Sequence, residues 1–142
     1  MNYDRNNSSV LSQVSVNKFR TRTVGLSNGK LFCYFNSVLQ LFLTIEDFSS
    51  FFYSKTYLNV QNKQEKTYCN ALSKFVKNIF CLEEEYEYLE PAFFHQIIAK
   101  TFNPSEQHDA HEFLLFLMGK LQEEMTPAHT TELYKNFKAI SS

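Results

Sequence analysis

The hydrophobic pattern of the chain predicts a series of helices joined by polar segments. Between residues 33 and 45 nearly every helical face is apolar, which is typical of a helix in the interior of a domain. One narrow polar line follows this helix at helical spacing, and it consists of Cys33, Asn36 or Ser37, Gln40 and Thr44. The sequence therefore predicts a buried helix that begins with a cysteine at the head of its polar line.

Downstream segments repeat their apolar positions at helical spacing and predict three more helices. Thr67 is expected to cap the first, Pro91 to lie in the first turn of the second, and residues 103–105 to start the last. The residues expected to face the core are Tyr68, Leu72, Phe75, Val76 and Ile79 in the first, Phe94, Ile97 and Ile98 in the second, and Ala110, Phe113, Leu114, Leu117 and Leu121 in the third. No β-hairpin pattern is found, so we expect an all-helical piece.

Composition places the chain among globular proteins. Of its 142 residues, 44% are hydrophobic and 16% aromatic, which is enough for one domain with a core. Residues 1–22 are polar and are expected to be a disordered tail. The net charge of −1 gives no general attraction for nucleic acid or anionic membranes, and no apolar run is long enough to span a bilayer. We therefore expect neither nucleic acid nor a membrane as a partner.

The three cysteines, Cys33, Cys69 and Cys81, show no Cys-x-x-Cys spacing. This pattern argues against a disulfide framework and against a zinc site. We expect a reducing compartment, the cytoplasm or the nucleus, and no metal or other cofactor.

Cys33 follows a turn marked by Asn28 and Gly29, two residue types that tolerate positive φ. A cysteine at a helix N-terminus lies near free backbone N–H groups and the positive end of the helix dipole, and both favour the nucleophilic thiolate. A free cysteine is more often a small buried hydrophobic residue, so position alone leaves both roles open.

Two segments resemble the motifs of a known enzyme family. Residues 24–42 resemble the cysteine box of the ubiquitin-specific proteases, which are papain-like thiol hydrolases that release ubiquitin, and residues 107–114 resemble their Gln-Gln-Asp-Ala-x-Glu-Phe-Leu box. The first box matches at Gly25, Leu26, Asn28, Cys33, Tyr34, Asn36, Ser37, Leu39 and Gln40. The main departure is at residues 30–32, where Lys-Leu-Phe replaces Gly-Asn-Thr and changes how closely the backbone can approach the thiol. Two long motifs in the right order identify the chain as a member of this family.

The resemblance implies a role for individual residues. Cys33 corresponds to the nucleophile, and Asn28 to the asparagine whose amide helps to stabilise the oxyanion. In the second box, Gln107, Asp109 and Glu112 are expected to support the site, the two carboxylates as orienting or buried hydrogen-bond partners.

The second box also contains two histidines, His108 and His111, next to its carboxylates. Zincin helices place two histidines four residues apart, whereas these two are three apart and no further ligand cluster is visible. The family motif explains the segment better than a metal site does.

The catalytic histidine of the family lies far downstream in a Gly-His-Tyr-like sequence, and none of the four histidines here matches it. No general base is therefore identified. Residues 133–140 resemble the segment before the zinc-binding fingers of the family. We expect residues 23–142 to form the mainly α, thumb-like helical lobe of a papain-like α+β protease, without its β-rich palm and fingers.

Two classes of function remain. In the first, the chain is a thiol-dependent deubiquitinase that acts on ubiquitin or a ubiquitinated protein through a Cys33 thioester, with the palm on a second chain or lost from the gene model. In the second, it is a catalytically inactive fragment that binds ubiquitin or regulates. A generic cysteine hydrolase with His95 or His129 as base is a third, more distant reading. An acidic run is expected to meet the basic tail of ubiquitin or to form a solvated loop, and it contains Glu83, Glu84, Glu85 and Glu87.

Overall fold

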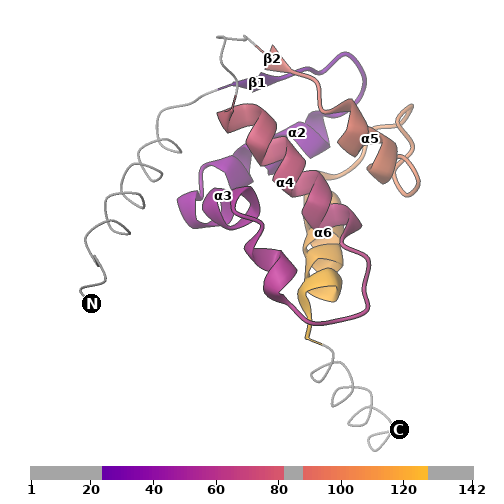
Figure 1. Cartoon of the computed structure of the whole chain (residues 1–142). Helices are drawn as coiled ribbons and strands as arrows, with labels where there is room; N and C mark the ends of the chain where they lie inside the picture. Colours follow the sequence, from indigo (N-terminus) through magenta and orange to yellow (C-terminus); the bar gives the residue numbers. More distant parts are fainter. Residues whose placement is uncertain (1–23, 82–87, 128–142) are drawn as a thin grey trace, which may run out of the picture.

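The computed structural model describes residues 24–81 and 88–127, and these residues fold into packed helices with almost no strand. The predicted mainly α fold class is confirmed. The predicted tail, the acidic residues 83–87 and His129 lie outside the described residues. None of the described helices combines the length and the apolar character needed to cross a membrane. The elements in chain order are β1 (Gly25–Leu26), α2 (Cys33–Leu43), α3 (Glu46–Tyr53), the 3-10 helix η1 (Thr56–Asn59), α4 (Thr67–Phe80), β2 (Tyr88–Leu89), α5 (Ala92–Ile98) and α6 (Ala110–Met125) (Figure 1).

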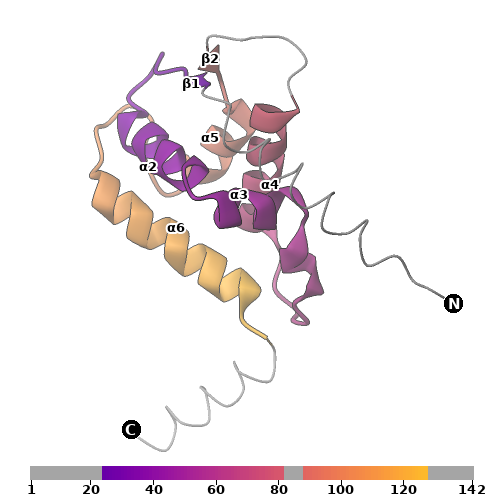
Figure 2. The ribbon, with the colours of Figure 1, turned by 90° about the vertical axis from the view of Figure 1, so that its left-hand side faces the viewer.

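Helix α2 forms much of the core, as its apolar pattern predicts. It packs against α3 and α6, and α4 packs against α3, α5 and α6. Figure 2 shows α6 running alongside α2. Phe35 and Leu39 of α2 are fully buried, as are Phe113 and Leu117 of α6. Because the body of α2 is buried against α3 and α6, the position of its first turn is also fixed.

The apolar stripes predicted for the later helices face this core. The buried members are Leu72, Phe75, Val76 and Ile79 of α4, Phe94 and Ile98 of α5, and Phe113, Leu117 and Leu121 of α6. The partly buried members are Tyr68, Ile97, Ala110 and Leu114. Helical spacing was enough to identify these faces because each apolar stripe lies on one face of its helix, and that face packs against the core.

The predicted start of the last helix is wrong. Helix α6 begins at Ala110, because the side chain of Asp109 accepts hydrogen bonds from the N–H groups of His111 (2.7 Å) and Glu112 (3.0 Å). Asn103 instead closes a separate turn, in which its side-chain oxygen accepts from the Ser105 N–H at 3.0 Å. Both positions carry residues that cap helices, and tertiary packing selects the second.

The predicted starts of the two preceding helices are each displaced by one residue. Pro91 is the N-cap residue of α5 and does not lie in its first turn. Lys66 is the N-cap residue of α4, so Thr67 is the first helical residue and makes no capping hydrogen bond.

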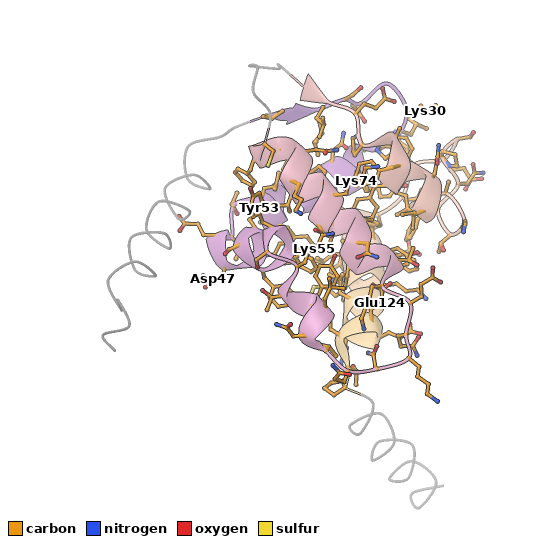
Figure 3. All side chains as sticks on the ribbon, viewed as in Figure 1. Lys30, Asp47, Tyr53, Lys55, Lys74 and Glu124 are labelled. Atoms are coloured by element: carbon orange, nitrogen blue, oxygen red, sulfur yellow. The ribbon has the colours of Figure 1, made fainter. Side chains whose placement is uncertain are left out.

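The N-terminus of α4 is capped instead by Glu124, a residue of α6. Its two carboxylate oxygens accept hydrogen bonds from the N–H groups of Tyr68 and Cys69, each at 2.8 Å. The Glu124 side chain is buried, and Figure 3 labels it where α6 meets the start of α4. A carboxylate from the last helix therefore satisfies backbone donors that α4 itself leaves free.

A short parallel strand pair contradicts the expectation of an all-helical piece. Gly25 pairs with Tyr88 and Leu26 with Leu89. Each strand has two residues, which is too short for an alternating pattern to be recognised in the sequence. The pair places the segment before Cys33 beside the segment before α5 (Figure 1).

An apolar groove lies between α3 and α6, with a volume of about 1020 Å³. Its walls include Phe48 and Phe51 of α3 and Met118 and Met125 of α6. Met118 is half exposed, so the groove is open to solvent in the described structure.

Candidate active site

Cys33 is the first residue of α2, and its side chain is exposed. The other two cysteines have different surroundings. Cys69 is buried within α4, where burial, with Glu124 beside it, raises the pKa of its thiol to about 12. Cys81 is exposed just after α4, with its sulfur 3.4 Å from the Tyr53 hydroxyl. Among the three, only Cys33 combines exposure with a helix N-terminus.

The polar line of α2 holds the segment that precedes Cys33. The side-chain amide of Asn36 donates to the carbonyl of Ser27 at 3.1 Å, and the amide of Gln40 donates to the carbonyl of Val24 at 2.8 Å. The Ser27 N–H continues the strand pair by donating to the carbonyl of Leu89 at 2.9 Å. These bonds hold residues 24–27 against α2. They therefore fix the position at which the turn before Cys33 begins.

Asn28, the predicted oxyanion residue, is exposed in the loop after β1. Its side chain makes no hydrogen bond within the described residues. The neighbouring Gly29 does not adopt positive φ, contrary to the turn geometry expected from the sequence. A Cβ at Gly29 would meet nothing closer than the Ser27 hydroxyl oxygen at 3.8 Å, so the turn does not require a glycine on steric grounds.

The departure at residues 30–32 has a structural counterpart at Phe32. Phe32 is the N-cap residue of α2 and provides no side-chain capping bond. Its ring is buried and stacks on the ring of His95, with a centroid separation of 3.7 Å and an interplanar angle of 8°. An aromatic side chain therefore packs into the structure at the position where the family motif has a threonine.

The second box starts α6 and packs against the cysteine helix. Asp109 is an exposed N-cap, and the N–H groups of Glu112 and His111 lower the pKa of its carboxyl. Tyr34, directly after Cys33, lies edge-to-face against Phe113 at 5.4 Å and against His108 at 5.1 Å between ring centroids. The two boxes are thus brought together through Tyr34.

Support of the site by three polar residues of the second box stays a prediction. Gln107 and Glu112 are exposed, and Asp109 is exposed as well, so neither carboxylate is a buried partner. Asp109 orients α6 by capping it, while Glu112 lies in the first turn of α6, where the helix dipole favours a negative charge.

No histidine within the described ranges donates to or accepts from the Cys33 sulfur. His95 is buried, and burial lowers its pKa, with opposing effects of Glu90, which raises it, and Lys30, which lowers it. His108 makes a 2.8 Å hydrogen bond with the carbonyl of Asn103, and His111 is exposed on α6.

In the part of the chain that is described, no group of three or more His, Cys, Asp or Glu side chains could hold a metal ion. The predicted substrate-binding residues lie outside this part, and they are Glu83, Glu84, Glu85 and Glu87.

Sequence reasoning missed the role of Glu124 and the contact between Phe32 and His95. A signal for the first exists, because Glu124 continues the stripe of Phe113, Leu117 and Leu121 at helical spacing and places a carboxylate on an apolar face. The second joins residues far apart in the chain, and no local pattern indicates it.

In the described residues an exposed thiol begins α2, and the second box packs against this helix through Tyr34. The family described as ubiquitin carboxyl-terminal hydrolase matches residues 24–141, which is most of the chain. The chain belongs to this family.

Proposed function

We propose that this protein is a thiol-dependent deubiquitinase in which Cys33 is the nucleophile. The observation that carries the proposal is the exposed thiol at the first residue of α2 in a chain of the ubiquitin carboxyl-terminal hydrolase family. Asn36 and Gln40 of the same helix hold the segment that precedes it. Helix N-termini favour thiolates, and an accessible thiolate is the form that attacks a carbonyl.

In the proposed reaction, the Cys33 sulfur attacks the carbonyl carbon of the C-terminal glycine of ubiquitin. The C–N bond breaks, the leaving amine takes up a proton, and ubiquitin remains on Cys33 as a thioester. Water then attacks the thioester, and the C–S bond breaks to release the ubiquitin carboxylate and the thiol. The side-chain amide of Asn28 is proposed to donate to the oxyanion in both steps.

The proton transfers need a general base that returns its proton to the leaving amine. Two of the described histidines are engaged elsewhere, because His95 stacks on Phe32 and His108 is bonded to the Asn103 carbonyl, and the third, His111, is exposed on α6. We propose that the base comes from outside the described residues, either in this chain or in a second chain that supplies the palm.

The proposal is tested by incubating the full chain with ubiquitin that carries a C-terminal electrophile and measuring the intact mass. An increase by one ubiquitin is expected, with loss of the adduct in Cys33→Ala and slower formation in Asn28→Ala. Cys81→Ala is the matched control, since Cys81 is also exposed but lies outside the cysteine box. Circular dichroism of the same samples establishes that each variant is folded.

A folded chain that forms no adduct would refute the proposal and favour the alternative of an inactive ubiquitin-binding or regulatory fragment. Titration of isotope-labelled ubiquitin with the unlabelled chain would then measure whether binding occurs without reaction.

A further inference from the structure

The residue before Cys33 is held by an aromatic contact and not by a helix cap. A threonine at the N-cap could accept a hydrogen bond from the N–H groups of the first turn, whereas Phe32 cannot. The Phe32 N–H donates to the Lys30 carbonyl at 2.9 Å, and its carbonyl accepts the first bond of α2 from the Asn36 N–H at 2.8 Å. The backbone of Phe32 therefore joins the turn to the helix.

The partner of this ring is His95 of α5. The two rings are nearly parallel, with their centroids 3.7 Å apart. Phe35 of α2 also contacts the His95 ring, in an edge-to-face arrangement with a centroid separation of 4.8 Å. His95 is thus enclosed by the first turn of α2 and the residue before it. Its Nε2 atom is buried and has no hydrogen-bond partner among the described residues.

An unpartnered buried nitrogen is a cost to folding, so hydrogen bonding does not explain why a histidine lies here. Its flat ring fills the narrow space beside Phe32, and this contact ties α5 to the turn before the thiol.

We propose that His95 is a positioning residue for Cys33, because its ring stacks on Phe32 and fixes the backbone from which the thiol projects. This inference rests on the proposed function only in taking Cys33 as the reacting group. His95 acts through Phe32 and is not proposed to touch the substrate. In this chain, the stack between His95 and Phe32 takes the place of the capping hydrogen bond that a threonine at position 32 would provide.

The test uses the three cysteines as internal reporters. The full chain is treated with iodoacetamide, and the modification rate of each cysteine is measured by peptide mass spectrometry. The rate at Cys33 reports the conformation of the turn and first helical residue, and the rate at the buried Cys69 reports opening of the core. The exposed Cys81 is the matched control. The ratio of the Cys33 rate to the Cys81 rate is the readout.

We expect His95→Ala to lower this ratio by about two- to fivefold, because a frayed first turn no longer presents its N–H groups to the thiolate. His95→Phe should restore the ratio, since a phenyl ring can stack in the same place without a buried nitrogen. A purely structural role would change Cys69 protection without this selective loss and rescue.

An unchanged ratio in His95→Ala, with Cys69 still protected, would overturn the proposal. If Cys69 becomes reactive in His95→Ala, His95→Leu decides, because leucine fills the space without a ring to stack. A lowered ratio in His95→Leu supports the positioning role, and a wild-type ratio refutes it. Alkylation needs no ubiquitin, so its outcome is independent of whether the chain reacts with the ubiquitin electrophile.

Discussion

Replacing Glu124 by alanine should lower the free energy of unfolding by about 1.5–5 kcal/mol, because it removes both acceptors at the start of α4. The Glu124 carboxylate is the cap of this helix, and it comes from a residue 56 positions from Tyr68 and 55 from Cys69. The substitution therefore weakens a connection between α6 and α4 and not only the end of one helix.

The magnitude follows from the two hydrogen bonds. Cys69 is buried, so its N–H group would lose its partner without access to water, at a cost of about 1–3 kcal/mol. Tyr68 is partly buried, and loss of its bond resembles loss of an ordinary N-cap, about 0.5–2 kcal/mol. Glu124→Gln keeps one acceptor oxygen and should fall between wild type and Glu124→Ala.

Glu123→Ala is the matched control. Glu123 is the neighbouring carboxylate on the same helix, it is exposed, and its ion pair with Lys120 has a separation of 3.6 Å. An exposed pair of this kind contributes little, so the control should change the free energy of unfolding by less than about 0.5 kcal/mol.

Urea denaturation followed by circular dichroism measures these differences. Amide hydrogen exchange gives a local readout, because Glu124→Ala should speed exchange at Tyr68 and Cys69 more than at the middle of α4. Equal stabilities of Glu124→Ala and Glu123→Ala would refute the assignment of Glu124 as the cap of α4.

Three further results are expected. Leu117→Ala should lower the free energy of unfolding by about 2–5 kcal/mol in urea denaturation, because Leu117 is fully buried. Leu115→Ala, at a side chain that is 60% exposed, should lower it by less than about 0.5 kcal/mol, and equal losses would contradict the assigned face of α6. Gln40→Ala should cost about 1 kcal/mol through its lost bond to the Val24 carbonyl, and Ser37→Ala, whose hydroxyl bonds only carbonyls of its own helix, should cost less in the same assay. Burial lowers the pKa of His95 in the folded chain, so the unfolded chain takes up the proton first as the pH falls. Wild type should therefore lose stability relative to His95→Phe as the pH falls from about 6.5, and parallel pH profiles of the melting temperature would disprove this.

Helical spacing predicted the buried faces because it depends on local periodicity. Leu72 and Phe75 in α4, and Phe113 and Leu117 in α6, needed no knowledge of their partners to be assigned to the core. The polar line of α2 was also visible in the sequence, but its partners, the carbonyls of residues 24 and 27, depend on how the chain returns along the helix.

The helix starts were harder to predict because several residues compete to cap them. Asn103 and Asp109 are both suitable caps, and packing of α6 against α2 selects Asp109. The cap of α4 comes from Glu124 in a different helix, so no residue near Thr67 indicates it. The stack of His95 on Phe32 likewise depends on the tertiary placement of α5.

We expect Cys33, and no other cysteine of this chain, to react with the C-terminus of ubiquitin. The most direct measurement is peptide mapping of the wild-type chain after reaction with a ubiquitin C-terminal electrophile, which identifies the modified cysteine without any substitution. The remnant of ubiquitin should be found on the peptide that contains Cys33, with Cys69 and Cys81 unmodified. A remnant on Cys81, or a folded chain with no modified cysteine, would contradict the assignment of Cys33 as the nucleophile.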